Sequence, residues 1–227
     1  MTKIKPLVLI CILIIPSGVL QAAEETVLLS NGDSLKVYFF MPEGVETAPL
    51  VMHVSSGSNN EFAARAGFWL GKELVERGWA VAVPVSPEGR MYFVDNPHFF
   101  PEILAALQAD YGLHGNKVVI SGISNGGSAA LAIAAQQPEH YVGIIAAPGR
   151  IWDEQKFTSS MEGIKVYLRI GEKDTYRWNN RLEGMAATLT AAGAEVDAAI
   201  VPGARHIFSL DWDSLQGWLD NLAESAH

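Results

Sequence analysis

Cysteine is almost absent from this 227-residue sequence: Cys11 is the only one, and it lies in an apolar run near the N-terminus. The chain therefore cannot form an intramolecular disulfide, and cysteine usage says nothing about the redox compartment in which it folds. Lysine and arginine are outnumbered by acidic residues and form no cluster, and the formal net charge is −9. We therefore expect no nucleic-acid partner and no electrostatic attachment to anionic lipid.

Motifs that would hold a metal ion or a nucleotide are missing as well. The six histidines form no HExxH pattern, and no G-x-G-x-x-G loop opens the first predicted strand–helix unit. We therefore expect neither a metal nor a nucleotide cofactor. Low-complexity tracts are also absent, while 49% of the residues are hydrophobic and 18% are charged. This composition supplies a buried core and excludes a disordered chain.

The N-terminal segment has the pattern of a secretory signal peptide. A basic start precedes an apolar run over residues 7–15, a Pro-Ser-Gly break follows, and Ala22 and Ala23 precede two glutamates. The run is much shorter than the roughly 20 residues of a membrane-spanning helix. We therefore expect cleavage near Ala22 or Ala23, which removes residues 1–22. The mature chain, residues 23–227, would be secreted or periplasmic and would keep no stable membrane anchor.

After this segment, strand and helix patterns alternate along the chain. A hairpin is predicted over residues 26–41, with Asn31-Gly32-Asp33 as its turn. Further strands are predicted over residues 49–55, 79–85, 117–121, 141–147, 165–170 and 195–201. Helices are predicted over residues 62–77, 101–111, 125–137, 180–192 and 212–223.

This alternation predicts an α/β fold. Its sheet would be mostly parallel and covered by helices on both faces, with the N-terminal hairpin as an antiparallel edge. No internal repeat, linker or composition break divides residues 23–227, so a single domain is predicted. In such a sheet, ligands bind beyond the carboxyl ends of the strands. Functional residues are therefore expected directly after strands.

A serine motif lies at one predicted strand-to-helix turn. GISNG, which begins at Gly122, has the G-x-S-x-G pattern and leads straight into an alanine-rich helix. Gly122 and Gly126 lack the Cβ atoms that would clash where strand and helix meet around a tight turn. Ser124 is therefore predicted to be a nucleophile, with the backbone N–H of Asn125 directed at a developing oxyanion.

A serine hydroxyl needs an adjacent base, which is in turn oriented by an acid. On this kind of fold, the three residues occur in the order serine, acid, histidine. Asp174 follows the strand predicted over residues 165–170, and His206 follows the strand over residues 195–201. They are therefore predicted to be the orienting carboxylate and the general base. Four other acidic residues are weaker candidates for the acid. Glu172 lies two residues before Asp174, Asp197 lies within a predicted strand, and Asp211 and Asp213 precede the last helix.

From Pro49 onward, the sequence resembles the α/β-hydrolase superfamily of serine hydrolases. The stretch from His53 to Gly149 is similar to the branch of poly(3-hydroxybutyrate) depolymerase-like and feruloyl esterase-like secreted esterases. This stretch contains the segment VVISGISNGGSAALAIAAQQPE. The resemblance implies ester hydrolysis through an acyl-enzyme intermediate, with the serine, aspartate and histidine above as a catalytic triad. It also implies Ser55 and Asn125 as the oxyanion positions.

The substrate site is predicted to be open, since the segment before the acid-bearing strand leaves no room for a large cap domain. An open site would accept large esters, including esters attached to a polymer. Three residues are predicted to contact substrate. Ser56 lies in the small-residue loop after an early strand, and Tyr176 and Trp178 follow the acid. Residues 91–93 are predicted to add a second aromatic wall, although plain packing of loop aromatics is an equally good interpretation.

Two other function classes are compatible with the sequence. A peptidase or amidase of the same superfamily would use the same three side chains, and a binding module could keep the fold without turnover. The sequence offers no N-terminal propeller or large cap that would restrict peptide access, and all three triad residue types are present. A secreted serine hydrolase that cleaves carboxylic esters is therefore the leading hypothesis.

Overall fold

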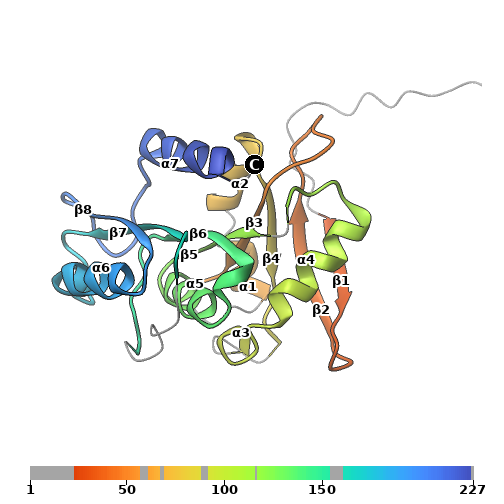
Figure 1. Ribbon diagram of the computed structural model, residues 1–227, viewed down its shortest axis with the longest axis horizontal. Coiled ribbons are helices and arrows are strands. Elements are labelled where there is room, and N and C mark those ends of the chain that lie inside the picture. Colours follow the sequence, from red (N-terminus) through yellow and green to blue (C-terminus); the bar gives the residue numbers. More distant parts are fainter. Residues whose placement is uncertain are drawn as a thin grey trace, which may run out of the picture.

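The computed structural model describes residues 23–56, 61–66, 69–87, 92–115, 117–153 and 161–225. In this part of the chain, an eight-stranded sheet lies between two layers of helices (Figure 1). The strands are β1 (Ala23–Leu28), β2 (Ser34–Phe40), β3 (Leu50–Val54), β4 (Ala80–Pro84), β5 (Val118–Gly122), β6 (Tyr141–Ala146), β7 (Lys165–Gly171) and β8 (Glu195–Val201). The helices are α1 (Glu61–Ala66), α2 (Trp69–Glu76), α3 (Tyr92–Asp95), α4 (Phe99–Asp110), α5 (Asn125–Gln136), α6 (Leu182–Ala191) and α7 (Trp212–Ser225), with short 3-10 turns η1 (Pro138–His140) and η3 (Trp178–Arg181).

The predicted alternation of strands and helices is confirmed, and most boundaries agree within three residues. The helix predicted over residues 62–77 is instead two helices, α1 and α2, and residues 67–68 between them lie outside the described part. Helix α3 was not predicted, because four residues are too few to show a helical period. The predicted signal segment, residues 1–22, also lies outside the described residues. So do residues 154–160, which belong to the segment that was predicted to be too short for a large cap domain.

The N-terminal hairpin forms as the turn residues predict. The N–H of Leu29 donates to the carbonyl of Asp33 at 2.9 Å, and Gly32 between them has a φ of +90°. Glycine adopts this left-handed conformation without a steric penalty. Strands β1 and β2 then pair antiparallel over six residues, from Ala23 opposite Phe39 onward.

The strand order in the sheet is β1-β2-β4-β3-β5-β6-β7-β8. Strands β1, β2 and β4 pair antiparallel, and every further pair in the series is parallel. This confirms the predicted mostly parallel sheet with an antiparallel edge. Parallel pairing brings the carboxyl ends of β3, β5, β6, β7 and β8 to one side of the sheet, so the segments that follow these strands become neighbours.

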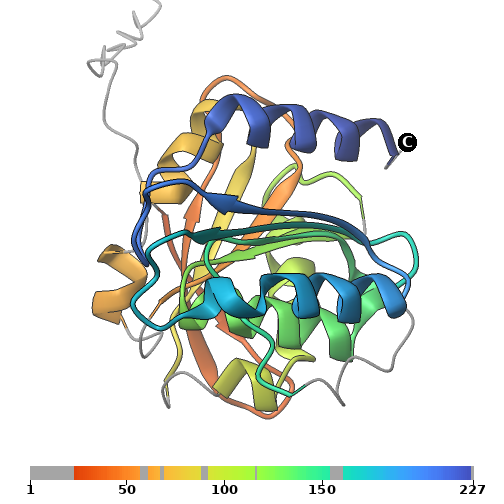
Figure 2. The ribbon, with the colours of Figure 1, turned by 90° about the vertical axis from the view of Figure 1, so that its left-hand side faces the viewer.

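Helices α2 and α7 cover one face of the sheet, and α4, α5 and α6 cover the other (Figures 1 and 2). Alternate strand residues serve the two cores: Ile120 and Ile144 face α5, while Val119 and Ile145 join the core beneath α7. Ten consecutive residues of α5 are buried, and all but two of them are glycine, alanine or serine, which allows close approach to the sheet. None of the helices in the described residues is long and apolar enough to cross a membrane.

Candidate active site

The turn between β5 and α5 holds Ser124 in an uncommon backbone conformation. Its φ is 58° and its ψ is −120°. A non-glycine residue with positive φ carries strain on the order of 1–3 kcal/mol, and such strain concentrates at functional sites. The N–H of Ser124 donates to the carbonyl of Pro148 at 2.7 Å, and that of Gly126 donates to the carbonyl of Ile123 at 2.9 Å. These bonds hold the strained turn.

The two glycines of the motif are sterically required at this turn. A Cβ atom on Gly122 would lie 2.2 Å from the carbonyl carbon of Gly126. A Cβ atom on Gly126 would lie 2.1 Å from the carbonyl oxygen of Val54 and 2.6 Å from that of Ser55. All of these neighbours are backbone atoms, so a side chain could not be accommodated by a rotamer change. The absence of Cβ atoms thus lets α5 begin directly against β3 and β5.

Ser124, His206 and Asp174 form one hydrogen-bonded chain. The Oγ atom of Ser124 lies 2.8 Å from Nε2 of His206, and Nδ1 of the same ring lies 3.1 Å from Oδ2 of Asp174. The other carboxylate oxygen, Oδ1, accepts the N–H of Tyr176 at 2.7 Å. The Asp174 side chain is fully buried, and that of His206 is 13% exposed. The structure therefore brings together the three side chains that were predicted from their positions after β5, β7 and β8.

The ends of β7 and β8 are packed tightly together, which places Asp174 beside the histidine loop. The N–H of Lys173 donates to the carbonyl of Ala204 at 2.7 Å, and that of Asp174 donates to the carbonyl of Gly171 at 3.1 Å. A Cβ atom on Gly171 would lie 2.0 Å from the carbonyl oxygen of Arg205. Glycine is therefore needed here too, because it allows the two loops to meet.

Two aromatic side chains hold the imidazole of His206 from the side. The ring centroid of Tyr176 lies 4.6 Å from that of His206 with an interplanar angle of 71°, and for Trp178 the values are 4.9 Å and 85°. Such edge-to-face contacts are favourable and fix the plane of a ring. Trp178 is only 7% exposed, whereas Tyr176 is 66% exposed. Both residues therefore support the histidine in addition to their predicted place beside substrate.

A pocket of about 400 Å³ lies at Ser124 and is lined by Ser124, Asn125, Arg150, Tyr176 and Trp178. Asn125, Tyr176 and Trp178, which were predicted as site residues, thus line the pocket, and their contacts with substrate stay a prediction. Asn125 is the first residue of α5, so its N–H has no carbonyl acceptor within the helix. Arg150 was not predicted as a site residue. The sequence did contain a signal for it: Arg150 comes four residues after the end of β6, which places it at the same side of the sheet as the other site residues.

Two predicted substrate contacts are not found in this pocket. Ser56 is not among its lining residues, and residues 57–60 of the same loop lie outside the described part. Phe93 is 1% exposed and packs against Phe100 at 5.2 Å between ring centroids, so plain packing, not an aromatic wall, is the correct one of the two interpretations for this residue. The large apolar ring is more stable buried in the core beside α4 than in a solvent-facing wall. The side chains of residues 91 and 92 lie outside the described part.

Ser55 and His53 are buried, and neither is among the described residues that line the pocket. Ser55 is 1% exposed, and its carbonyl lies against Gly126 as described above, which places its backbone next to the turn. Its role as the second oxyanion donor stays a prediction. His53 is fully buried, with Nδ1 2.9 Å from Oγ of Ser121, and burial lowers its pKa to about 4 because the charged ring would lose its hydration. Within the described residues, no three His, Cys, Asp or Glu side chains gather as metal ligands would.

Comparison with known proteins identifies a family. The model of the Esterase family, described as "Putative esterase", matches residues 98–226, the part of the chain that holds Ser124, Asp174 and His206. No curated protein matches the chain in sequence.

Several solved structures are similar in fold. A Bacillus cereus carboxylesterase has 15% sequence identity and a TM-score of 0.66, over 83% of this chain and 94% of that one. A structure of fungal esterases from Rhizomucor miehei has 15% identity and a TM-score of 0.66, over 90% of this chain and 84% of that one. Dipeptidyl peptidase 4 from Porphyromonas gingivalis has 14% identity and a TM-score of 0.67, over 89% of this chain but only 35% of that one.

Sequence identities this low show a common fold and no more, whereas the family match covers more than half of the chain. The narrower resemblance to the poly(3-hydroxybutyrate) depolymerase-like and feruloyl esterase-like branch stays a prediction. The chain has the α/β-hydrolase fold and belongs to the Esterase family.

Proposed function

We propose that this chain is a serine esterase that hydrolyses carboxylic esters through an acyl-enzyme intermediate. The observation that carries the proposal is the hydrogen-bonded chain from Ser124 through His206 to Asp174, with Ser124 in the wall of a pocket. The family match supports ester hydrolysis as the reaction class. A serine at the wall of a pocket, on a strained strand-to-helix turn and beside a histidine that is itself held by a buried carboxylate, is the arrangement that makes a hydroxyl nucleophilic.

Acylation follows from the direction of these hydrogen bonds. Nδ1–H of His206 donates to Asp174, which leaves Nε2 free to accept the hydroxyl proton of Ser124. As Oγ attacks the ester carbonyl carbon, this proton passes to Nε2 and the carbonyl oxygen becomes an oxyanion. The N–H of Asn125 donates to that oxyanion. The intermediate then collapses, and the departing alcohol takes the proton from Nε2, leaving the acyl group on Ser124.

Deacylation repeats these steps with water as the nucleophile. Nε2 of His206 takes a proton from water while its oxygen attacks the acyl carbon, and the proton then returns to Oγ of Ser124 as the carboxylic acid leaves. The Asp174 carboxylate accepts N–H groups from His206 and Tyr176, so it keeps the imidazole of His206 oriented in both half-reactions. The net reaction converts ester and water to alcohol and carboxylic acid and needs no other reactant.

The test of this proposal uses residues 23–227 and p-nitrophenyl esters of increasing acyl length. We expect hydrolysis by the unaltered chain and by Ser209→Ala, an exposed serine outside the pocket, and a loss of several orders of magnitude in Ser124→Ala. A fluorophosphonate probe should label the first two proteins only. Labelling of Ser124→Ala at full strength would overturn the proposal. Hydrolysis of peptide p-nitroanilides in place of esters would identify a peptidase, and a folded protein with neither activity would identify a binding module.

We also propose that the protein is exported after removal of residues 1–22. In support, the described strand β1 (Ala23–Leu28) lies after the predicted cleavage position, so removal of residues 1–22 takes away none of its described residues. Glu25, in the same strand, is hydrogen-bonded to a distant part of the fold, because the hydroxyl of Tyr111 donates to its carboxylate. N-terminal sequencing of the protein from the periplasm and the medium tests this. A chain that starts at residue 1 and stays inside the cell would contradict it.

A further inference from the structure

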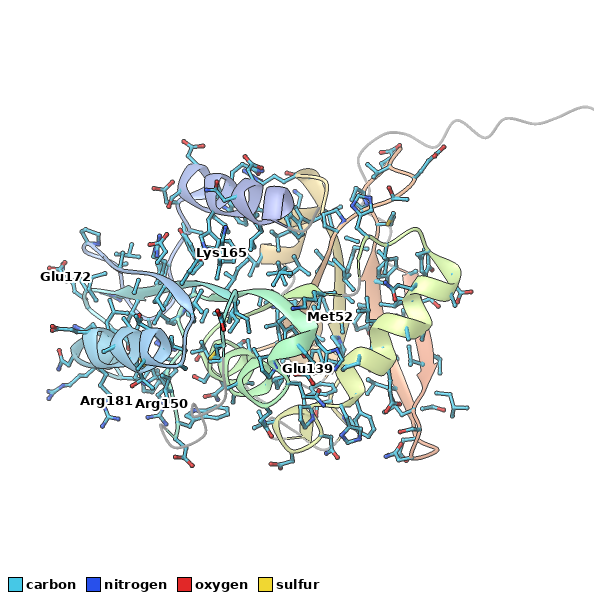
Figure 3. All side chains as sticks on the ribbon, viewed as in Figure 1. Met52, Glu139, Arg150, Lys165, Glu172 and Arg181 are labelled. Carbon is cyan, nitrogen blue, oxygen red and sulfur yellow. The ribbon has the colours of Figure 1, made fainter. Side chains whose placement is uncertain are left out.

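Arg150 is the charged side chain in the pocket at Ser124; the other described residues that line it are neutral. Strand β6, which Arg150 follows, lies between β5 and β7 in the sheet. Arg150 therefore comes from the strand end between those that carry Ser124 and Asp174. In Figure 3, the labelled Arg150 lies on the α6 side of the sheet, whereas the labelled Lys165 lies toward α7. The proposed mechanism above makes no use of this guanidinium.

The backbone and the guanidinium of Arg150 are both held in place. Its N–H donates to Oγ of Ser128 at 2.9 Å, and the hydroxyl of Ser128 donates to the carbonyl of Ser124 at 3.2 Å. Its Cζ atom lies 5.5 Å from the ring centroid of Trp178, within the range of a cation–π contact. Trp178 is the buried ring that also packs against His206. The cation is therefore positioned relative to the same atoms that position the nucleophile and the base.

Among the described residues, the guanidinium of Arg150 lacks the carboxylate partner that two other arginines, Arg77 and Arg169, have. Its Nε atom is buried and makes no hydrogen bond in the described part of the chain. No described carboxylate lies within ion-pair distance of it, whereas Arg77 pairs with Glu73 at 2.7 Å and Arg169 pairs with Asp197 at 2.8 Å. A buried donor without an acceptor is unfavourable. The planar fork of a guanidinium matches the two oxygens of a carboxylate.

We propose that Arg150 binds a carboxylate of the substrate, so that the preferred substrates are small esters that carry a second, ionised carboxyl group. This inference rests on the esterase function proposed above and names its substrate class. Monoesters of dicarboxylic acids and acyl esters of hydroxy acids have this chemistry. The pocket volume of about 400 Å³ is in the range of small-molecule sites. Asn125, Tyr176 and Trp178 add no competing charge and leave Arg150 as the anchor.

The experiment compares esters with and without the charge, in two matched pairs. Methyl hydrogen adipate and methyl hexanoate place or omit a carboxylate in the acyl part, and 4-acetoxybenzoate and phenyl acetate do so in the alcohol part. We expect Arg150→Gln to lower kcat/KM for the anionic member of at least one pair by roughly 10- to 100-fold, mainly through KM. The neutral member should stay within about threefold, because the proton-transfer residues are untouched. Arg181→Gln removes an exposed arginine outside the pocket and should change neither member.

Equal losses on the anionic and neutral members would overturn the proposal, because Arg150 would then support the site rather than select substrate. Unchanged kinetics on both anionic esters would overturn it as well. If the unaltered chain hydrolyses none of the four esters, the esterase proposal fails, and the anion site is judged separately by calorimetric titration of Ser124→Ala with methyl hydrogen adipate. Binding that is lost when Arg150→Gln is added supports the anion site. Binding that persists in the double variant, or no binding at all, overturns it.

Discussion

Gly126 offers a sharp test of how the serine turn is built. Replacement by alanine adds one Cβ atom, which would lie 2.1 Å from the carbonyl oxygen of Val54 and 2.6 Å from that of Ser55. Cβ atoms essentially never approach a heavy atom beyond their own residue and its chain neighbours within 3.0 Å. Because both neighbours belong to the backbone at the end of β3, the start of α5 must move away from β3 by roughly 1 Å.

The expected cost follows from this displacement. Overpacking of a core costs about 1–3 kcal/mol. We expect the upper end, about 3 kcal/mol, since ten consecutive residues of α5 are buried and the helix cannot move without disturbing them. For a chain of this size, that corresponds to a fall in Tm of about 6–12 °C. Ser124 lies two residues away and would shift relative to Nε2 of His206, so kcat/KM for p-nitrophenyl acetate should fall by about 100-fold.

Gly217→Ala is the matched control. Gly217 lies in the middle of α7, and apart from its chain neighbours and the backbone of its own helix, no described atom lies within 4 Å of the position that its Cβ would take. The same substitution there should raise the free energy of unfolding by up to about 1 kcal/mol, because alanine favours a helix more than glycine does, and should leave kcat/KM unchanged. Urea unfolding followed by circular dichroism measures both variants. A Gly126→Ala protein that is as stable and active as the unaltered chain would refute the steric argument.

Three other substitutions test buried residues in and near the site, and Tyr176→Ala serves as an exposed comparison. Burial lowers the pKa of His53 to about 4, against about 6.5 in an unfolded chain, so the unfolded state binds more protons between these two values. The free energy of unfolding should therefore fall by roughly 3 kcal/mol as the pH drops from 7 to 4, and urea unfolding of His53→Gln should show a smaller dependence. Asp174→Asn should lower kcat on p-nitrophenyl acetate by roughly 10⁴-fold, because an amide no longer holds the required tautomer of His206. Trp178→Ala should cost about 3–5 kcal/mol of stability in the same unfolding assay, and Tyr176→Ala much less, because only Trp178 is buried.

Each of these outcomes can fail in a recognisable way. An equal pH dependence with and without His53 would show that another group carries it. An Asp174→Asn protein that kept more than a tenth of the original kcat would remove Asp174 from the mechanism. Equal losses of stability for Trp178→Ala and Tyr176→Ala would show that the Trp178 ring contributes little through burial.

The positions of Ser124, Asp174 and His206 after strands could be predicted because each depends on a local pattern. Strands appear as short apolar runs, and the serine turn appears as two glycines at fixed distances from a serine. The structure gives the steric reason for that spacing, since both glycines meet backbone atoms. Acid and histidine were recognised only by their order and by the strands they follow, which is weaker information than a motif.

Predictions about which side chains line the pocket were less successful, because lining depends on neighbours that are distant in sequence. The sequence left an aromatic wall and plain packing equally open for Phe93, and its ring is buried against Phe100. Arg150 was not placed in the site, although it lines the pocket with Ser124. An aromatic residue after a strand is equally compatible with core and wall, and an arginine in a loop is most often exposed to solvent.

By itself, the sequence determined the alternation of strands and helices, the strained serine turn and the strand ends from which Ser124, Asp174 and His206 emerge. These features follow from side-chain periodicity and from glycine's missing Cβ atom, which act over a few residues. Only the tertiary structure decided that Oγ of Ser124 lies 2.8 Å from a histidine 82 residues away. It also decided that Arg150, whose buried Nε meets no acceptor among the described residues, lines the same pocket. Those placements depend on the order of β5, β6, β7 and β8 in the sheet and on how their helices pack, which no local pattern encodes.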